Sequence, residues 1–119
     1  MQDHNNLRVF DLTDRLAMEI YGATAEFPAS EKFGLRSQIR RAAVSVPTNI
    51  VEGCARETNG ELARFLDIAF GSIRELEYLL SLSHRLGYFD EDAYRQLEKL
   101  RNLAAGGLAK LRRKVRAHS

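Results

Sequence analysis

A stripe of polar side chains with helical spacing contains the residues best suited to hydrogen-bonding chemistry. The stripe lies between Leu35 and Ala55 and combines amide, guanidinium, hydroxyl and carboxylate groups three or four residues apart. Its members are Gln38, Arg41, Ser45, Asn49 and Glu52. Because a buried polar group without a partner costs about 1–3 kcal/mol, a packed stripe of this kind must be fully paired. The stripe therefore predicts either a solvated helix face or a paired polar seam against another helix or subunit.

Ser72 and Glu75 could complete that seam from a second helix. They are three residues apart in another segment with helical patterning, so they share one helix face. Arg41 and Glu75 are the expected ion pair across the seam. An exposed ion pair contributes little to stability, whereas a buried one can fix helix register or subunit arrangement. We therefore expect the seam to serve assembly rather than catalysis.

Basic residues in two segments are suited to contacts with phosphate. The 119-residue chain has a formal net charge of +2, but the charge is unevenly spread. Residues 101–119 contain six basic and no acidic residues, and the remainder contains 12 basic and 16 acidic residues. A basic segment on an acidic body can bind nucleic acid or an acidic partner, and it also suits the negative end of a helix dipole. The candidate phosphate contacts are Arg36, Arg40, Arg41, Arg112, Arg113, Lys114 and Arg116.

The sequence lacks the residue patterns of the enzymes and metalloproteins that helical bundles support. His84 has Ser81 three residues before it, so it forms no Glu-x-x-His pair, and the other two histidines lie near the ends of the chain. The segment from Gly53 to Gly60 lacks the Gly-Lys-Ser/Thr ending of a phosphate-binding loop. Ser72 has no nearby histidine that would activate it as a nucleophile. We expect a protein without enzymatic activity, metal or cofactor.

Composition places the chain among globular proteins of the cytoplasm. Apolar residues make up 45% and charged residues 29%, and no stretch approaches the roughly 20 apolar residues of a membrane span. The polar residues at the N-terminus do not resemble a signal peptide. Cys54 is the single cysteine, so we expect no internal disulfide and a thiol that packs in the core. These features predict a cytoplasmic protein without membrane attachment.

Apolar residues that recur with a period near 3.6 predict four helices and no sheet. The helices are expected from about Val9 to Glu26, from Leu35 to Ala55, from a cap at Thr58 or Asn59 to Leu86, and from a cap at Asp90 through Val115. Short links between them predict an all-α fold, an antiparallel up-down-up-down four-helix bundle. We expect a single domain over residues 1–119, with residues 1–6 and 117–119 mobile.

Further expectations concern the edges of the core and the end of the third helix. Leu12 is expected in the core stripe of the first helix, and Leu86 at the end of the stripe of the third. Gly87 is expected to end the third helix in a left-handed conformation. Phe27 and Phe33 flank the link after the first helix, and both are expected to fold back over the end of the core.

The second helix contains a proline within its apolar face. That face continues across position 47 and consists of Leu35, Ile39, Ala42, Val46 and Ile50. Pro47 lacks an N–H group and its ring clashes with the carbonyl of Ala43, which costs about 3 kcal/mol inside a helix. Because the apolar face continues past position 47, we predict one helix that is kinked at Pro47. Ser45 and Thr48 are expected to form hydrogen bonds with the carbonyls that the proline leaves unbonded. The alternative is a break after Val46, with Pro47 beginning a new helix.

Two motifs in the sequence resemble those of a known bacterial family. Residues 27–53 read F-P-x-x-E-x-F-G-L-x-x-Q-I-R-R-A-A-V-S-V-P-T-N-I-V-E-G, and residues 65–77 read F-L-x-I-A-x-G-S-x-x-E-L-E. Together they resemble the four-helix-bundle proteins encoded in intervening sequences of 23S rRNA genes, over roughly residues 7–115. That family is itself similar to the accessory variability determinant of diversity-generating retroelements.

The resemblance implies an antiparallel four-helix bundle that assembles as a ring-like homopentamer, without known catalysis. It also implies binding to rRNA or other structured RNA, or to a ribonucleoprotein partner such as a reverse transcriptase or a ribosomal component. Our leading hypothesis is a non-enzymatic, oligomeric bundle that binds RNA through the seven basic residues named above. The alternative is a homo-oligomeric protein-interaction scaffold that binds no nucleic acid and uses its polar stripes as subunit contacts.

Overall fold

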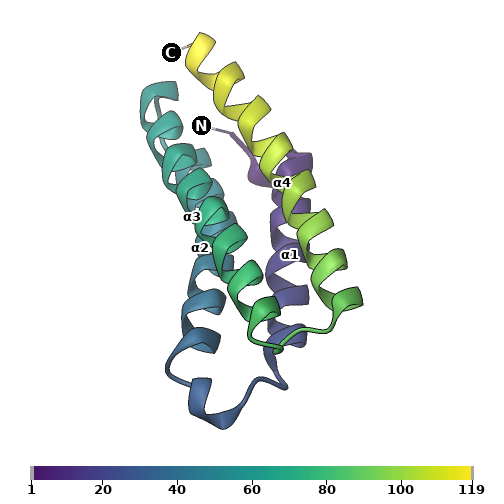
Figure 1. Ribbon diagram of the computed structural model, residues 1–119. Helices are drawn as coiled ribbons and strands as arrows, with labels where there is room; N and C mark the ends of the chain where they lie inside the picture. The colour runs from purple at the N-terminus through teal and green to yellow at the C-terminus, as the bar shows by residue number, and fades with distance from the viewer. Residues whose placement is uncertain (1, 119) are drawn as a thin grey trace.

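The structure is a computed structural model that describes residues 2–118, and it is built from helices (Figure 1). The four long helices are α1 (Arg8–Thr24), α2 (Leu35–Cys54), α3 (Asn59–Arg85) and α4 (Glu91–Ala117). Two short 3-10 turns, η1 (His4–Asn6) and η2 (Ala29–Glu31), precede α1 and α2. No strand occurs in the described range, so the predicted all-α four-helix fold is confirmed. The predicted mobility of residues 1–6 and 117–119 stays a prediction, and Met1 and Ser119 lie outside the described residues.

Each helix packs against two others, which gives a four-sided bundle of 44 × 24 × 20 Å. Both α1 and α3 contact α2 and α4. Figure 1 shows the α1–α2 and α3–α4 links at one end and both termini at the other. At the link end, the Tyr88 hydroxyl donates to Glu31 Oε2 at 3.0 Å; at the terminal end, the Asn59 side-chain amide donates to the His118 carbonyl at 3.1 Å. Within residues 2–118, none of the helices has the length and apolar character that crossing a membrane requires.

The helix ends are set by local hydrogen bonds and by one glycine. Thr58 Oγ1 accepts from the Glu61 N–H at 3.2 Å, and Asp90 Oδ1 accepts from the Ala93 N–H at 2.8 Å, so both act as N-caps. Gly87 has a φ of 81°, the left-handed conformation that ends α3. The predicted caps and the role of Gly87 are therefore confirmed.

The core lies along the bundle axis and receives side chains from all four helices. Its largest fully buried aliphatic residues are Leu16, Ile20, Ile39, Ile50, Leu66, Ile73, Leu76, Leu80 and Leu108. Thr13 is buried where the sequence suggested Leu12, which is only half-buried. The Thr13 hydroxyl donates to the Phe10 carbonyl at 3.0 Å, so burial leaves it with a partner.

Two predictions about the ends of the core are wrong. Phe27 is buried as expected and packs against Phe89, with ring centroids 5.1 Å apart. Phe33, in contrast, is 89% exposed, because Tyr88 and Phe89 from the other link already cover this end with Phe27. Leu86 is 52% exposed, because it follows the last turn of α3 and lies outside the helical stripe.

Helix α2 is continuous through Pro47, so the alternative of a break after Val46 is wrong. Val46 and Pro47 are both buried, so the apolar face runs through the proline. The predicted bonding of freed carbonyls by Ser45 and Thr48 is also wrong. The Ser45 hydroxyl instead meets a side chain of α3, and the exposed Thr48 makes no side-chain hydrogen bond within residues 2–118. The bend at Pro47 stays a prediction.

Candidate nucleic-acid and subunit interfaces

Asp67 on α3 binds two of the predicted phosphate contacts on α4. Its Oδ1 atom accepts from Nε and Nη2 of Arg112 at 3.1 and 3.0 Å, and Arg116 Nη2 lies 2.5 Å from Oδ2. The Arg112 guanidinium also lies 4.2 Å from the centroid of the Phe70 ring. Partial burial of the Asp67 carboxyl opposes ionisation, but the hydrogen bonds from both arginines outweigh this and lower its pKa. Two cations near the end of α4 are thus held by the bundle itself.

Arg113 and Lys114 lie in the same turn and remain exposed. Neither side chain takes part in an ion pair within the described part of the chain. Consecutive residues on a helix point about 100° apart, so these two cations can reach different phosphates. Lys110, one turn earlier, is also exposed and extends this basic surface, although the sequence prediction did not include it.

The three basic residues on α2 lie near the opposite end of the bundle (Figure 1). Arg40 is occupied: its Nε donates to Thr24 Oγ1 at 2.9 Å and its Nη2 to the Tyr21 carbonyl at 3.0 Å. Its guanidinium also lies 4.5 Å from the Tyr21 ring centroid. Arg36 is half-buried and Arg41 is exposed. The seven predicted phosphate contacts therefore form two separate groups rather than one surface.

The predicted polar stripe divides into a packed part and an exposed part. Ser45 Oγ and Ser72 Oγ lie 2.8 Å apart and join α2 to α3. Asn49 Nδ2 donates to the Ser45 carbonyl at 2.8 Å and to its hydroxyl at 3.0 Å, so this half-buried cluster is internally paired. The exposed members of the stripe are Gln38, Arg41, Glu52 and Glu75.

The predicted ion pair between Arg41 and Glu75 does not form. Both side chains are exposed, and neither takes part in an ion pair among residues 2–118. Glu52 instead pairs with Arg56 on its own helix at 3.0 Å. The physical reason is that spacing along each helix does not determine how two helices are rotated against each other, and at this contact Ser45 and Ser72 meet instead. Arg41 is therefore an accessible cation beside the α2–α3 seam.

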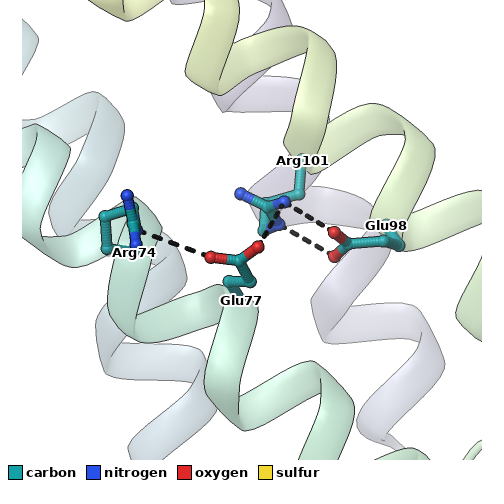
Figure 2. Close-up of polar contacts among 4 residues, drawn as sticks. All are labelled: Arg74, Glu77, Glu98 and Arg101. Atoms are coloured by element: carbon teal, nitrogen blue, oxygen red, sulfur yellow. Dashed lines mark hydrogen bonds and ion pairs between the residues drawn. The ribbon is translucent and has the colours of Figure 1, made fainter.

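A buried arginine that the sequence reading missed lies between α3 and α4. Arg101 is only 3% exposed and binds both carboxylate oxygens of Glu98, at 2.8 and 2.6 Å. Figure 2 shows Glu77 of α3 on its other side, 3.4 Å away, with Arg74 beyond Glu77 at 3.5 Å. The hydrogen bonds that Arg101 donates to the Glu98 carboxylate raise the pKa of Arg101 further, so it stays charged. Arg101 thus belongs to the packing of the bundle and not to the basic surface.

The contacts of His84 and Cys54 are those of residues that contribute to packing. His84 Nε2 lies 2.8 Å from Glu91 Oε2, and its ring stacks on Tyr94 with centroids 4.1 Å apart. The hydrogen bond with His84 lowers the pKa of Glu91. Cys54 is buried, and burial raises the pKa of its thiol, so the thiol packs as predicted. No group of three or more histidine, cysteine, aspartate or glutamate side chains within residues 2–118 is arranged to hold a metal ion.

These features define an all-α, four-helix-bundle protein with a paired polar cluster at the α2–α3 contact and a basic end on α4. The chain belongs to the family of 23S rRNA-intervening sequence proteins, whose family model matches residues 5–108. The resemblance that the two motifs suggested is thereby confirmed.

A solved structure shares the fold. It is the crystal structure of a protein with unknown function from the S23 ribosomal protein family of Bacteroides thetaiotaomicron. The alignment has a TM-score of 0.81 and 23% sequence identity, and it covers 88% of this chain and 95% of that one. No curated protein matches the sequence. At this identity the likeness establishes the arrangement of helices, and function must be argued from the residues of this chain.

Proposed function

We propose that this chain is a non-enzymatic, homo-oligomeric helical-bundle protein of the cytoplasm that binds structured RNA or a ribonucleoprotein through the basic end of α4. The observation that carries the proposal is the exposure of Arg113 and Lys114 in a turn whose other two cations are held by Asp67. The membership in a family named for an rRNA intervening sequence supports an RNA ligand. Suitable partners are rRNA, another structured RNA, or a protein bound to RNA, such as a reverse transcriptase or a ribosomal component.

The chemistry of this surface suits phosphate rather than bases. Guanidinium and ammonium groups bind phosphate oxygens, and binding releases counterions from the nucleic acid. The exposed tyrosines Tyr21 and Tyr78 lie on α1 and α3, away from the end of α4, so they offer no stacking platform beside the basic residues. We therefore expect binding that depends on RNA shape and salt more than on sequence.

The polar cluster supports the non-enzymatic part of the proposal. Ser45 bonds both Asn49 and Ser72, and within residues 2–118 none of the three forms a hydrogen bond with a titratable base. A serine without a base within hydrogen-bond reach stays a poor nucleophile at neutral pH. The cluster suits a structural contact.

A filter-binding titration against a 23S rRNA fragment tests the RNA proposal. The variant Arg113→Gln/Lys114→Gln should bind more weakly, and its plot of log affinity against log salt should be less steep by about 1–2. The matched control is Arg95→Gln/Lys99→Gln, which removes the same charge from the exposed first half of α4 and should bind as the wild type does. An affinity that is absent at low salt, or unchanged when the salt is raised, would contradict the proposal.

The second candidate is a homo-oligomeric scaffold without an RNA ligand, and exposed apolar side chains favour it. Phe33, Met18 and Val44 are all exposed on the described surface, where they could pack against another chain. Light scattering at tens of micromolar decides the assembly question, and the family resemblance leads us to expect a pentamer. Arg41→Glu separates the two roles. Lost assembly would favour the scaffold, and intact assembly with lost RNA binding would favour a role for Arg41 in RNA contact.

A further inference from the structure

Phe33 protrudes from the link between α1 and α2. At 89% exposure it is the most exposed of the large apolar residues in the described range. It follows η2 and precedes the first residue of α2, Leu35, and Lys32 Nζ lies 5.4 Å from the centroid of its ring. Exposed aromatic rings are enriched as the central anchors of protein interfaces, where they fill a pocket on the partner. Phe33 therefore has the exposure of an interface anchor, and the pocket that it would fill must be sought on another surface.

A groove of about 410 Å³ between α1 and α2 offers such a pocket. Its apolar wall includes Ala17, Met18, Tyr21, Val44, Pro47 and Val51. Met18 is 72% exposed and Val44 is 40% exposed, so the groove is open to solvent. Arg40 holds the Tyr21 side of the groove in place, because its guanidinium donates to the Tyr21 carbonyl and lies over the Tyr21 ring.

Phe33 does not fill this groove in its own chain. Helix α2 begins at Leu35, and a rise of about 1.5 Å per residue places Val44 about 14 Å and Val51 about 24 Å further along its axis. The exposure of Phe33 confirms that its ring contacts little of its own bundle. A ring that fills the groove must therefore come from another molecule.

Unpaired charges flank both surfaces with opposite signs. Asp14 lines the groove and Asp11 lies one helical turn before it, and both are exposed. On either side of Phe33 in the sequence are Lys32, exposed on the protruding link, and Arg36, half-buried in the first turn of α2. None of these four side chains takes part in an ion pair within residues 2–118. Unpaired carboxylates thus lie beside the groove and unpaired cations beside Phe33, whereas the nearby Glu31 carboxylate accepts hydrogen bonds from the Tyr88 hydroxyl and the Leu35 N–H. This complementarity favours contact between two copies of the chain.

We propose that Phe33 of one copy inserts into the α1–α2 groove of a second copy, with Lys32 and Arg36 beside Asp14 and Asp11. This inference rests on the homo-oligomeric assembly proposed above and assigns its contact surfaces. Because the anchor and the groove are different patches of the same chain, the contact is head-to-tail. Repetition of such a contact closes into a ring when the rotation allows, and otherwise extends as a filament.

Two exposed sites allow the inference to be tested without disturbing the core. Phe33→Ser removes the anchor, and Met18→Lys/Val44→Lys places two charges in the groove. Each variant alone should be a folded monomer by circular dichroism and light scattering at concentrations where the wild type assembles. Their mixture should form a 1:1 complex of twice the 13.5 kDa chain mass, because the groove of the first and the anchor of the second remain intact. Leu86→Ser is the control, since it removes an exposed apolar side chain from the same end and should assemble as the wild type does.

The outcomes separate this inference from the assembly on which it rests. A monomeric wild type would overturn the proposed oligomer, and with it the inference. An assembled wild type with an assembled Phe33→Ser variant would overturn the inference alone. Two monomeric variants that form no complex when mixed would also overturn it, because the two surfaces would then not meet. Charge reversal gives a second readout: Lys32→Glu/Arg36→Glu should weaken assembly at least ten-fold, and Asp11→Lys/Asp14→Lys in the same chain should restore it.

Discussion

The Asp67 carboxylate on α3 holds the Arg112 guanidinium on α4 through two hydrogen bonds of 3.1 and 3.0 Å. Arg116, one turn further along α4, binds the same carboxylate at 2.5 Å. Guanidinium groups bind carboxylates and phosphates in the same manner, so in the proposed RNA complex Asp67 would compete with phosphate for these two arginines. If the proposed RNA binding holds, Asp67 connects the stability of the α3–α4 contact with the number of cations that are free to bind phosphate.

Replacement of Asp67 by Asn should lower the stability of the bundle at neutral pH. The charge-assisted hydrogen bonds to both arginines weaken, and for a partly exposed pair we expect a loss of about 1 kcal/mol or less in the free energy of unfolding. The folded state lowers the pKa of Asp67, so its contribution is present above the unfolded pKa of about 3.9 and is lost as the pH falls through the lower, folded value. Urea unfolding at several pH values measures this: the gap between wild type and variant should shrink below about pH 4. A gap that widens in acid would contradict the assignment.

The same Asp67→Asn substitution should strengthen RNA binding. It frees Arg112 and Arg116 to contact phosphate, so we expect an affinity gain of several-fold at low salt and a steeper salt dependence. The control is Glu57→Gln, which removes one exposed negative charge without an ion-pair partner and leaves the arginines bound to Asp67. Equal gains from the two variants would show that general charge, and not release of the arginines, is responsible.

Arg101 should be replaceable by an apolar residue of similar length but not by a small one. Its stem lies in the α3–α4 contact, and its head is bound by Glu98. Arg101→Ala removes both the packing and the charge-assisted bonds, and we expect it to cost about 2–3 kcal/mol in the free energy of unfolding. Arg101→Met restores most of the packed volume and leaves Glu98 and Glu77 partly open to water, so we expect a loss of about 1 kcal/mol or less. Denaturant unfolding of both variants measures their free energies of unfolding. A Met variant that is less stable than the Ala variant would contradict the prediction.

The sequence was informative for several features that depend on neighbouring residues. Thr58, Asp90 and Gly87 were predicted as helix ends because each acts through bonds or a backbone conformation within one turn. The apolar face of α2 was predicted because it follows one helical period, and that period also showed correctly that the helix continues through Pro47.

Two of the failures concern the relative placement of elements, and a third concerns a signal within one helix. Arg41 and Glu75 have the right spacing on each helix, but spacing does not determine how two helices are rotated against each other, and Ser45 and Ser72 meet instead. Phe33 was expected to cover the core because nothing in the sequence shows that Tyr88 and Phe89 already do so. Arg101 was assigned to the basic segment, although it follows Leu97 by four residues and precedes Ala104 by three, on the buried stripe of α4. A cation at such a position signals a buried ion pair, and Glu98, three residues before it, was available as its partner.

The Ser45–Ser72 contact should act as a coupled unit. Ser45→Ala or Ser72→Ala leaves the other hydroxyl with one partner fewer in a half-buried site, which we expect to cost about 1 kcal/mol each. The double variant should cost less than the two single costs together, because the first substitution already removes the shared hydrogen bond. A double-mutant cycle by denaturant unfolding should give a coupling of about 0.5–1 kcal/mol. Additive costs would mean that the two hydroxyls do not stabilise each other.

Gly53 and Gly71 lie inside helices, and alanine should have opposite effects at the two positions. A Cβ atom at Gly53 would lie 2.9 Å from both Leu62 Cδ1 and Phe65 Cβ, so α2 and α3 approach closely there. At Gly71, no atom outside its own helix surroundings lies within 4 Å of the added Cβ. Alanine in a helix is favoured over glycine by about 1 kcal/mol when the site has room.

Gly71→Ala should therefore raise the free energy of unfolding by about 0.5–1 kcal/mol. Gly53→Ala gains the same backbone preference but must push α3 away, because Phe65 Cβ is fixed to the backbone and cannot rotate aside. We expect a net loss of about 1–3 kcal/mol, as for other overpacked sites. Thermal and denaturant unfolding of the two variants measure both effects. Stabilisation by Gly53→Ala would show that the α2–α3 contact is looser than the 2.9 Å approach implies, and destabilisation by Gly71→Ala would reveal a neighbour on the exposed face of α3, such as another subunit.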